Sequence, residues 1–226
     1  MSLGRTYAND LLKLEFNATP IPNLADNAGT SPLTNIQVAL HTAWPSETDT
    51  QDASEAAYTG SGRAAVARTT GGWTVTNDQV SPVANIVFGQ RTNAGAAIVC
   101  PFFSTGVATS GATKIMRRGV IGSRLGAFAA ATSDTFTVPG LAGLANDDQI
   151  VFLSTHGSAL PTGITEGTVY YVIGLSGDTF QVSTTVGGGA VNVTAVGDGV
   201  AFRVSPITIN LNSIPTLTTA TTLYQE

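Results

Sequence analysis

Residues 169–183, VYYVIGLSGDTFQVS, contain two runs that are typical of β-strands, with a glycine-containing turn between them. The runs, 169–173 and 179–183, are rich in the β-branched and aromatic residues that strands favour. Similar runs occur at 134–138, 149–153 and 190–194, separated by turns rich in glycine or proline. Five short strands of this kind predict a compact sandwich or barrel. The tripeptide Asp134-Thr-Phe136 recurs as Asp178-Thr-Phe180, a faint internal echo at two entries from turn to strand.

The charges of the chain are divided unevenly around these strands. Residues 132–203 carry six acids and one base, whereas the rest of the chain carries nine of each, so the net charge of −5 lies in this segment. Charge keeps a surface solvated, and a near-neutral surface tolerates protein contacts. We therefore predict an acidic, outward-facing β-module of residues 132–203. It is inserted into a base domain of residues 1–131 and 204–226 that serves attachment and oligomerisation.

Charged residues are scarce in the whole chain. Only 11% of the residues are Asp, Glu, Lys or Arg, against about 25% in an average soluble domain. The surface must therefore be rich in Thr, Ser, Asn, Gly and Ala. Such a surface suits a subunit that buries much of itself against copies or partners, and a weakly charged monomer is the alternative.

One segment of the base domain has the spacing of an amphipathic helix. Tyr7, Leu11 and Leu14 fall at i, i+4 and i+7 within residues 6–16, and Leu12 and Phe16 widen the stripe. Prolines at positions 20 and 22 forbid its continuation. We expect Tyr7, Leu11 and Leu14 to dock onto neighbouring subunits.

The remainder of the base domain is predicted to consist of strands and turns. Strands are expected at residues 35–41, 64–68, 73–76, 86–88, 97–100, 114–117 and 207–211. The predicted fold class is mainly β: a sandwich or barrel base domain with one short N-terminal helix and an inserted small β-domain. If the insert were excised, the strand before it and the strand near 205–211 could pair directly.

The chain lacks the residue patterns of nucleophilic catalysis. It has two histidines, and His41 at the end of a predicted strand is expected to have a hydrogen-bonded structural role, while His156 is expected in an exposed loop. Cys100, the single cysteine, lies among apolar residues, which favours a buried small side chain over a reactive thiol. One cysteine also excludes an internal disulfide, and the Gly-x-Ser-x-Gly pattern of hydrolases is absent.

Other kinds of site are equally weak in the sequence. Asp147 and Asp148 could serve as an acid–base pair or as calcium ligands, but their surroundings predict a turn that enters a strand. The glycines at 60–62 and 187–189 lack the context of phosphate-binding loops. We therefore predict that the protein is not an enzyme and holds no cofactor or metal.

Four of the ten basic residues lie within eleven positions: Lys114, Arg117, Arg118 and Arg124. An isoelectric point near 4.9 and the lack of interleaved aromatic residues argue against nucleic-acid binding. A contact with an acidic patch of a neighbouring protein is the preferred interpretation, and Lys114, Arg117 and Arg118 are the predicted interface residues. No apolar stretch approaches the ~20 residues that span a bilayer, and the N-terminus shows no secretory signal.

Several motifs of the base domain occur in one order: residues 31–45 (SPLTNIQVALHTAWP), 54–60 (SEAAYTG), 63–68 (RAAVAR), 72–75 (GWTV), 80–88 (VSPVANIVF) and 217–222 (LTTATT). In this order and spacing they resemble a family of small virion proteins of tailed bacteriophages, described as tail-fibre-like or as capsid decoration proteins. Within the insert, residues 134–140, 160–163, 167–172 and 178–182 resemble a β-module of phage fibres and adhesins. Shorter members of the family lack this insert.

The resemblance implies a non-enzymatic structural protein of the phage particle. We expect a homotrimeric capsid decoration protein, of the cement or head-fibre type, attached to the outer surface of the particle and made in the bacterial host cytoplasm. Its partners would be copies of itself and the major capsid protein or tail proteins. The alternative is a short tail-fibre or receptor-binding protein that contacts a glycan or protein of the host surface. A carbohydrate-active depolymerase, which needs two carboxylates about 5–10 Å apart, is a further alternative.

Overall fold

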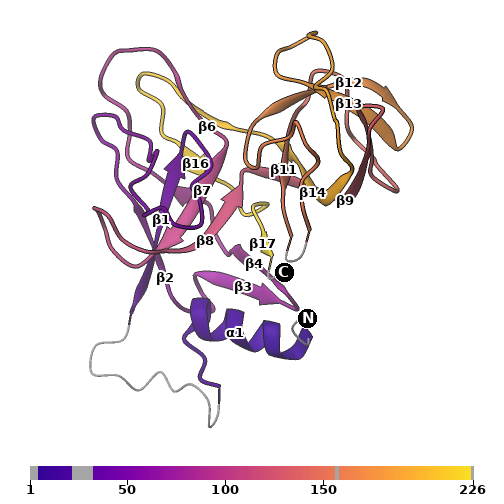
Figure 1. Ribbon diagram of the computed structural model, residues 1–226. Coiled ribbons are helices and arrows are strands. Elements are labelled where there is room, and N and C mark those ends of the chain that lie inside the picture. The colour runs from indigo at the N-terminus through magenta and orange to yellow at the C-terminus, as the bar shows by residue number, and fades with distance from the viewer. Residues whose placement is uncertain (1–4, 22–32, 156–157, 225–226) are drawn as a thin grey trace. The chain divides into compact units, whose positions relative to one another are not determined.

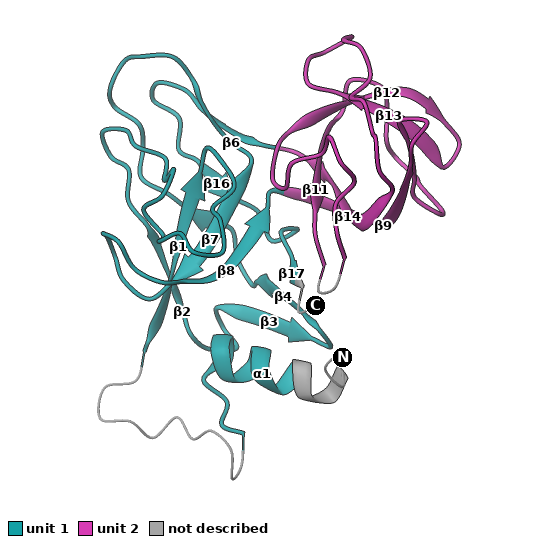
Figure 2. Cartoon of the chain, in the orientation of Figure 1, with its two compact units in different colours: residues 1–121, 206–226 teal, residues 122–205 magenta. Residues whose placement is uncertain are grey.

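The part of the chain that the structure describes is mainly β-structure with one short helix near the N-terminus (Figure 1), which confirms the predicted fold class. The computed structural model describes residues 5–21, 33–155 and 158–224. The chain divides into two compact units: unit 1 consists of residues 1–121 and 206–226, and unit 2 of residues 122–205 (Figure 2).

The described residues of unit 1 form one helix and four small sheets. The helix is α1 (Arg5–Asn17). The largest sheet has the order β2 (Ala64–Ala67), β1 (Asn35–His41), β7 (Phe102–Gly106), β8 (Ile115–Val120). A three-stranded sheet has the order β17 (Leu223–Tyr224), β4 (Gln79–Pro82), β3 (Trp73–Thr76). The two pairs are β15 (Ile207–Ile209) with β6 (Ile98–Cys100), and β16 (Thr216–Leu217) with β5 (Ile86–Val87).

Helix α1 attaches to unit 1 through the side chains at positions i and i+4 of its last turns. Leu12 and Phe16 are fully buried, and the ring of Phe16 meets the ring of Trp73 edge-on at 4.9 Å between centroids. The guanidinium of Arg68 donates hydrogen bonds to the backbone carbonyls of Leu14 and Glu15. A cation at these carbonyls both satisfies orphan acceptors and complements the helix dipole. Packing and this cap therefore hold a helix too short to be stable alone.

Unit 2 is a closed six-stranded barrel. Its strand order is β10 (Thr135–Thr137), β13 (Thr179–Ser183), β12 (Tyr170–Ser176), β11 (Gln149–Leu153), β14 (Gly197–Val204), β9 (Gly122–Ala131), and β9 pairs back with β10. Alternate side chains fill the interior, where Phe152 stacks on Phe136 at 4.6 Å and meets Phe128 edge-on at 4.8 Å. The repeated tripeptides are partners in this barrel, because Phe136 lies opposite Phe180 in the β10–β13 ladder.

The insert begins earlier than the sequence indicates. The predicted boundary at 132 leaves out residues 122–131, which form β9 and pair with β14 and β10 inside the barrel. Gly122 and Val204 are paired, so the two ends of the insert lie side by side. With the insert in place, the strand at Ile207–Ile209 pairs with β6 and not with the strand that precedes the insert. The pairing predicted for a chain without the insert stays a prediction. Unit 2 thereby includes Arg124, and its six acids and two bases leave a net charge of −4.

A second difference concerns the predicted strand at 190–194, which is not a strand in the structure. Its backbone is tied down at Val191, whose N–H donates to the carbonyl of Val182, and at Val193, whose N–H donates to the Asp134 carboxylate. The Val193 side chain is buried in the barrel core. The segment therefore has the apolar residue typical of a strand because that residue fills the core. The place in the barrel between β11 and β9 is occupied by β14.

Candidate functional site

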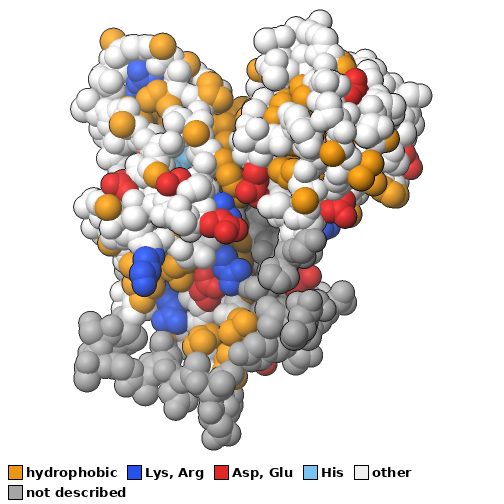
Figure 3. All heavy atoms as spheres, viewed as in Figure 1, with side chains coloured by type: hydrophobic (Ala, Val, Ile, Leu, Met, Phe, Trp, Pro, Cys, Tyr) orange, Lys and Arg blue, Asp and Glu red, His pale blue; other side chains and the backbone are white. Residues whose placement is uncertain are grey.

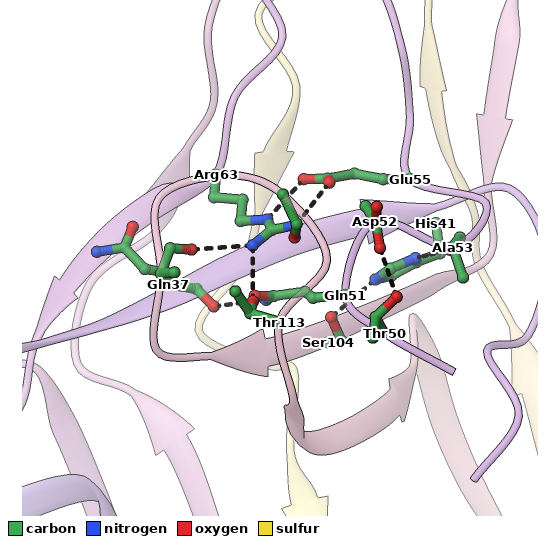
Figure 4. Close-up of polar contacts among 12 residues, drawn as sticks. Gln37, His41, Thr50, Gln51, Asp52, Ala53, Glu55, Arg63, Ser104 and Thr113 are labelled. Carbon is green, nitrogen blue, oxygen red and sulfur yellow. Dashed lines mark hydrogen bonds and ion pairs between the residues drawn. The ribbon is translucent and has the colours of Figure 1, made fainter. Parts of the chain in front are cut away.

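Strand β1 is buried on both of its faces, which is unusual for a strand of an open sheet. Ile36, Val38 and Leu40 point into the unit 1 core. The opposite face is covered by the loop of residues 42–56, which we call the covering loop. Gln51 of this loop donates a hydrogen bond to the carbonyl of Gln37. The polar cluster drawn in Figure 4 joins the covering loop to β1, to Ser104 of β7 and to Arg63 and Thr113.

His41, the last residue of β1, fastens the covering loop to the sheet. Its side chain is fully buried, with Nδ1 2.9 Å from the carbonyl oxygen of Ala53 and Nε2 2.7 Å from Oγ of Ser104. A carbonyl can only accept, so Nδ1–H donates to Ala53 and the Ser104 hydroxyl donates to Nε2. The predicted structural, hydrogen-bonded role of His41 agrees with these contacts. Ser104 is also fully buried, so this serine–histidine pair faces no solvent.

The burial of His41 predicts a pH dependence of stability. Desolvation lowers the pKa of the imidazole, and this outweighs the opposing effects of the Ala53 carbonyl and Glu55, while Arg63 lowers the pKa further. A lowered pKa means that the unfolded chain binds the proton more readily. The stabilisation is therefore fully present above the usual histidine pKa of about 6.5 and is lost as the pH falls through the folded value.

We expect the free energy of unfolding of unit 1 to decrease between pH 7 and pH 5, measured by urea titrations followed by tryptophan fluorescence. Both tryptophans, Trp44 and Trp73, belong to unit 1 and report on it alone. The variant His41→Gln should be less stable at pH 7 but should show a flatter pH profile. An equally steep profile in this variant would assign the titration to another group.

Arg63 and Glu55 form the central ion pair of the cluster. Arg63 Nε and one terminal nitrogen each lie 3.0 Å from a different Glu55 oxygen, in the bidentate geometry drawn in Figure 4. The remaining donors reach the carbonyls of Ala108 and Gly111 and the hydroxyl of Thr113. The Arg63 side chain is 1% exposed and the Glu55 side chain 24%. This pair therefore joins the covering loop to the loop of residues 107–114.

A surface hollow of about 340 Å³ lies beside this ion pair. Its apolar wall includes Leu40, Ala56, Tyr58 and Phe88, and its polar wall includes Asp52, Glu55, Ser61, Arg63 and Ser110. Two glycines hold one wall close to the next segment: a Cβ on Gly60, where φ is +100°, would lie 2.1 Å from the carbonyl oxygen of Gln90, and one on Gly89 would lie 1.9 Å from that of Gly60. The Tyr58 hydroxyl donates to the Gly89 carbonyl across this contact.

The predicted interface residues of α1 have different environments. Leu11 and Leu14 are partly exposed, so their side chains remain accessible at the surface of unit 1. The side chain of Tyr7 lies outside the part of the chain that the structure describes. Leu12 and Phe16, which were expected to widen the same stripe, are instead the residues that attach the helix to the core.

The predicted basic interface is largely occupied by contacts within unit 1. Arg117 forms a bidentate pair with Glu15, at 2.6 Å for the shortest contact. Arg118 lies over the ring of Trp44 at 4.9 Å, donates to the carbonyl of Pro45 and pairs with Glu47 at 3.5 Å. Lys114 is exposed. The two arginines therefore hold α1 and the covering loop in place, and Lys114 is the member of the trio with the most accessible charge.

The acids of unit 2 mostly bind backbone N–H groups of loops. Asp178 accepts from Gly140 and Leu141, Glu166 from Ser154, and Asp147 from Gly187. Asp148 accepts from Ala145 and pairs with Arg203 at 3.0 Å. The expected turn at Asp147 and Asp148 is confirmed, with Asp147 at a φ of +68°. These carboxylates therefore stabilise the loops of the barrel in addition to charging its surface.

Asp134 provides the sharpest test of this role. Its carboxylate accepts the N–H of the buried Val193 at 2.7 Å, and its φ is +62°. Asp134→Ala should lower the free energy of unfolding of unit 2 by about 2 kcal/mol. The change leaves the N–H of Val193 without its acceptor and places alanine in the left-handed region of backbone conformation. Asp134→Asn, which keeps an acceptor and tolerates that φ, should lose much less.

The control is Asp198→Ala, because Asp198 is exposed and its carboxylate has no hydrogen-bond partner among the described residues. Thermal unfolding followed by far-ultraviolet circular dichroism measures all three variants. Equal losses of stability for Asp134→Ala and Asp198→Ala would contradict the role of the Asp134 carboxylate in holding the loop backbone.

Cys100 is buried in the core of unit 1, and burial raises the pKa of its thiol to about 11. The thiol is therefore protonated at neutral pH, in agreement with the prediction of a buried apolar residue. His156, which was predicted to lie in an exposed loop, is outside the residues that the structure describes. Among residues 5–21, 33–155 and 158–224, no three His, Cys, Asp or Glu side chains gather closely enough to hold a metal ion. No helix in the same residues is long and apolar enough to cross a membrane.

The comparisons with known proteins add no family to this picture. No protein-family model matches the sequence, and no curated protein matches it either.

Proposed function

We propose that this chain is a non-enzymatic structural subunit of a tailed-bacteriophage particle, a homotrimeric decoration protein of the cement or head-fibre type on the outer surface of the capsid. The observation that carries the proposal is the use of charged side chains inside the fold. Arg63, Arg117 and Arg118 pair with acids of their own unit, and most acids of unit 2 hold loop backbone.

The consequence is a surface with little charge to keep subunits apart. On the face seen in Figure 3, uncharged side chains and backbone predominate over acidic and basic groups. Exposed apolar side chains occur in unit 1 at Val87, Val99, Leu211 and Ile214. A neutral surface with scattered apolar groups favours association with identical or different protein subunits. The partners would be copies of this chain and the major capsid protein, with tail proteins as the alternative.

The order of the motifs in unit 1 supports the phage origin, as described for the sequence. Partly exposed Leu11 and Leu14, with Lys114 at the accessible edge of the basic cluster, remain the proposed interface residues. The partners include neither nucleic acid nor a membrane, and the site of action is the particle surface.

Native mass spectrometry and immunogold electron microscopy test this proposal. A species of three times the 23.1 kDa chain mass supports the trimer. Antibody label on the heads of phage particles whose genome encodes the chain supports decoration. Label on the tail would favour the short tail-fibre or receptor-binding alternative. A monomer that labels no part of the particle would contradict the proposal.

Removal of unit 2 tests the division of labour between the two units. Because Gly122 pairs with Val204 at the ends of the insert, a short glycine–serine linker can replace residues 122–205. We expect the product to be folded, with the fluorescence of buried Trp73, and to keep the oligomeric state of the full chain. An unfolded or monomeric product would show that unit 2 takes part in the core or in the assembly.

A further inference from the structure

The hollow beside the Arg63–Glu55 pair has the properties of a small-ligand site. Its volume of about 340 Å³ lies within the range of about 300–1,000 Å³ that is usual for such sites. It combines an apolar wall, to which Phe88 and Tyr58 contribute rings, with a polar wall of carboxylates and hydroxyls. Its walls are fixed by the bidentate ion pair and by the close contact of Gly60 with Gly89 and Gln90. A site held rigid in this way loses little entropy on binding.

Hydrogen-bond capacity remains available on the polar wall. Asp52 uses one carboxylate oxygen for Thr50, and its other oxygen has no partner among the described residues. Each oxygen of Glu55 accepts one bond from Arg63, while a carboxylate oxygen can accept two. The hydroxyls of Ser61 and Ser110 make no side-chain hydrogen bond to a described residue. The wall therefore offers several acceptors together with hydroxyls that can both donate and accept.

The charges of the hollow decide which ligands fit. An anion would meet the carboxylates of Asp52 and Glu55 and could not use Arg63, whose five N–H donors all have protein acceptors. A ligand rich in hydroxyl groups suits this wall, because adjacent hydroxyls can donate to the carboxylates while accepting from the serines. The carbon face of the same ligand would cover the apolar wall.

We propose that the hollow binds a neutral polyhydroxylated ligand of the size of one saccharide unit. Asp52 and Glu55 accept hydrogen bonds from its hydroxyl groups, Tyr58 and Phe88 contact its carbon face, and Arg63 is a positioning residue that holds Glu55. This site is in unit 1, whereas the part of the chain that resembles a module of phage fibres and adhesins is the insert. The inference does not depend on the phage assignment, since it rests on the shape and chemistry of the hollow alone.

The test is a titration of the ¹⁵N-labelled full chain, followed by amide chemical shifts. The probes are glucose, galactose, mannose, rhamnose and N-acetylglucosamine, each to high millimolar concentration, with methylguanidinium as a cationic probe. A single saccharide unit has few atoms, so a dissociation constant in the millimolar range is expected for at least one sugar. The shifts should be confined to residues 52–63, 88–90 and 109–110.

Two variants locate the binding. Ala57 is exposed and lines the hollow, so Ala57→Trp should fill it and weaken binding at least tenfold without removing a hydrogen bond. Asp52→Ala should weaken binding several-fold, and Asp198→Ala in unit 2 should leave it unchanged. The dispersion of the amide spectrum shows whether each variant is folded. If Ala57→Trp is not folded, Asp52→Ala locates the binding by itself.

Three outcomes would overturn the proposal: no shift with any of the five sugars, shifts elsewhere that persist in both hollow variants, or binding of methylguanidinium alone. The last result would instead assign the hollow to a basic side chain of a partner protein.

Discussion

Replacing Arg63 by methionine should lower the free energy of unfolding of unit 1 by about 3–5 kcal/mol, the usual cost of removing one partner of a buried ion pair. The variant leaves Glu55, the carbonyls of Ala108 and Gly111 and the hydroxyl of Thr113 without their donor. Glu55 is partly exposed and can be solvated by water, which places the expected loss toward the lower end. Urea unfolding followed by tryptophan fluorescence measures it.

A double-mutant cycle separates the ion pair from the rest of the network. Glu55→Gln alone should cost less than Arg63→Met, because Arg63 then retains its contacts with the 107–114 loop. The two changes together should cost less than their sum, since each removes the same pair. Arg63→Lys serves as the matched control: it keeps the charge but cannot reproduce the planar fork, and it should recover only part of the loss. Full recovery by lysine would show that charge alone matters here.

Replacing Phe152 by alanine should destabilise unit 2 by about 3–5 kcal/mol, the range for a large aromatic residue lost from a core. Phe152 is fully buried in the barrel, and its ring contacts those of Phe128, Phe136 and Phe180. Its removal leaves a cavity at the centre of this aromatic cluster. We expect the barrel to unfold at much lower temperature or denaturant concentration than in the unaltered chain.

The placement of the tryptophans makes this experiment selective. Trp44 and Trp73 belong to unit 1, and unit 2 contains no tryptophan. Because each unit has its own core, Phe152→Ala should shift the transition seen by circular dichroism and leave the fluorescence transition in place. Phe152→Leu, which keeps most of the buried volume, should give a clearly smaller shift. A parallel shift of the fluorescence transition would show that the units unfold together.

The strongest structural predictions came from short-range patterns. Alternating apolar residues and turn glycines identify most strands of the barrel, because the period of two and the demand for positive φ in turns are local properties. The helix was found from its apolar spacing and its prolines. Its binding face was not, because Leu11, Leu12, Leu14 and Phe16 form one broad stripe. Only tertiary packing, in which Phe16 meets Trp73, selects Leu12 and Phe16 for the core.

The strand at 190–194 shows the limit of the same reasoning. Val191 and Val193 alternate like strand residues, yet the barrel already closes through β14, β9 and β10. An apolar residue is needed there to fill the core, and the sequence contains no signal that separates core filling from ladder pairing. Gly122–Ala131 was missed for a related reason: small residues such as its alanines indicate a strand weakly.

The candidate site depended almost wholly on tertiary structure. Asp52, Glu55 and Arg63 carry no recognisable spacing, and the one available signal was an arginine next to an alanine-rich strand in a chain with few charges. Arg117 and Arg118 were expected to face a partner, but the fold brings Glu15 and Trp44 to them from distant parts of the chain.

The sequence by itself determined the β-rich composition, the inserted module, the N-terminal helix and the low charge, because each is a property of neighbouring residues or of totals. Tertiary structure alone decided which charges are paired, which face of the helix is buried and where a hollow forms. These depend on loops that bring together residues far apart in the chain, and a buried ion pair or a cavity exists only once that closure has been made.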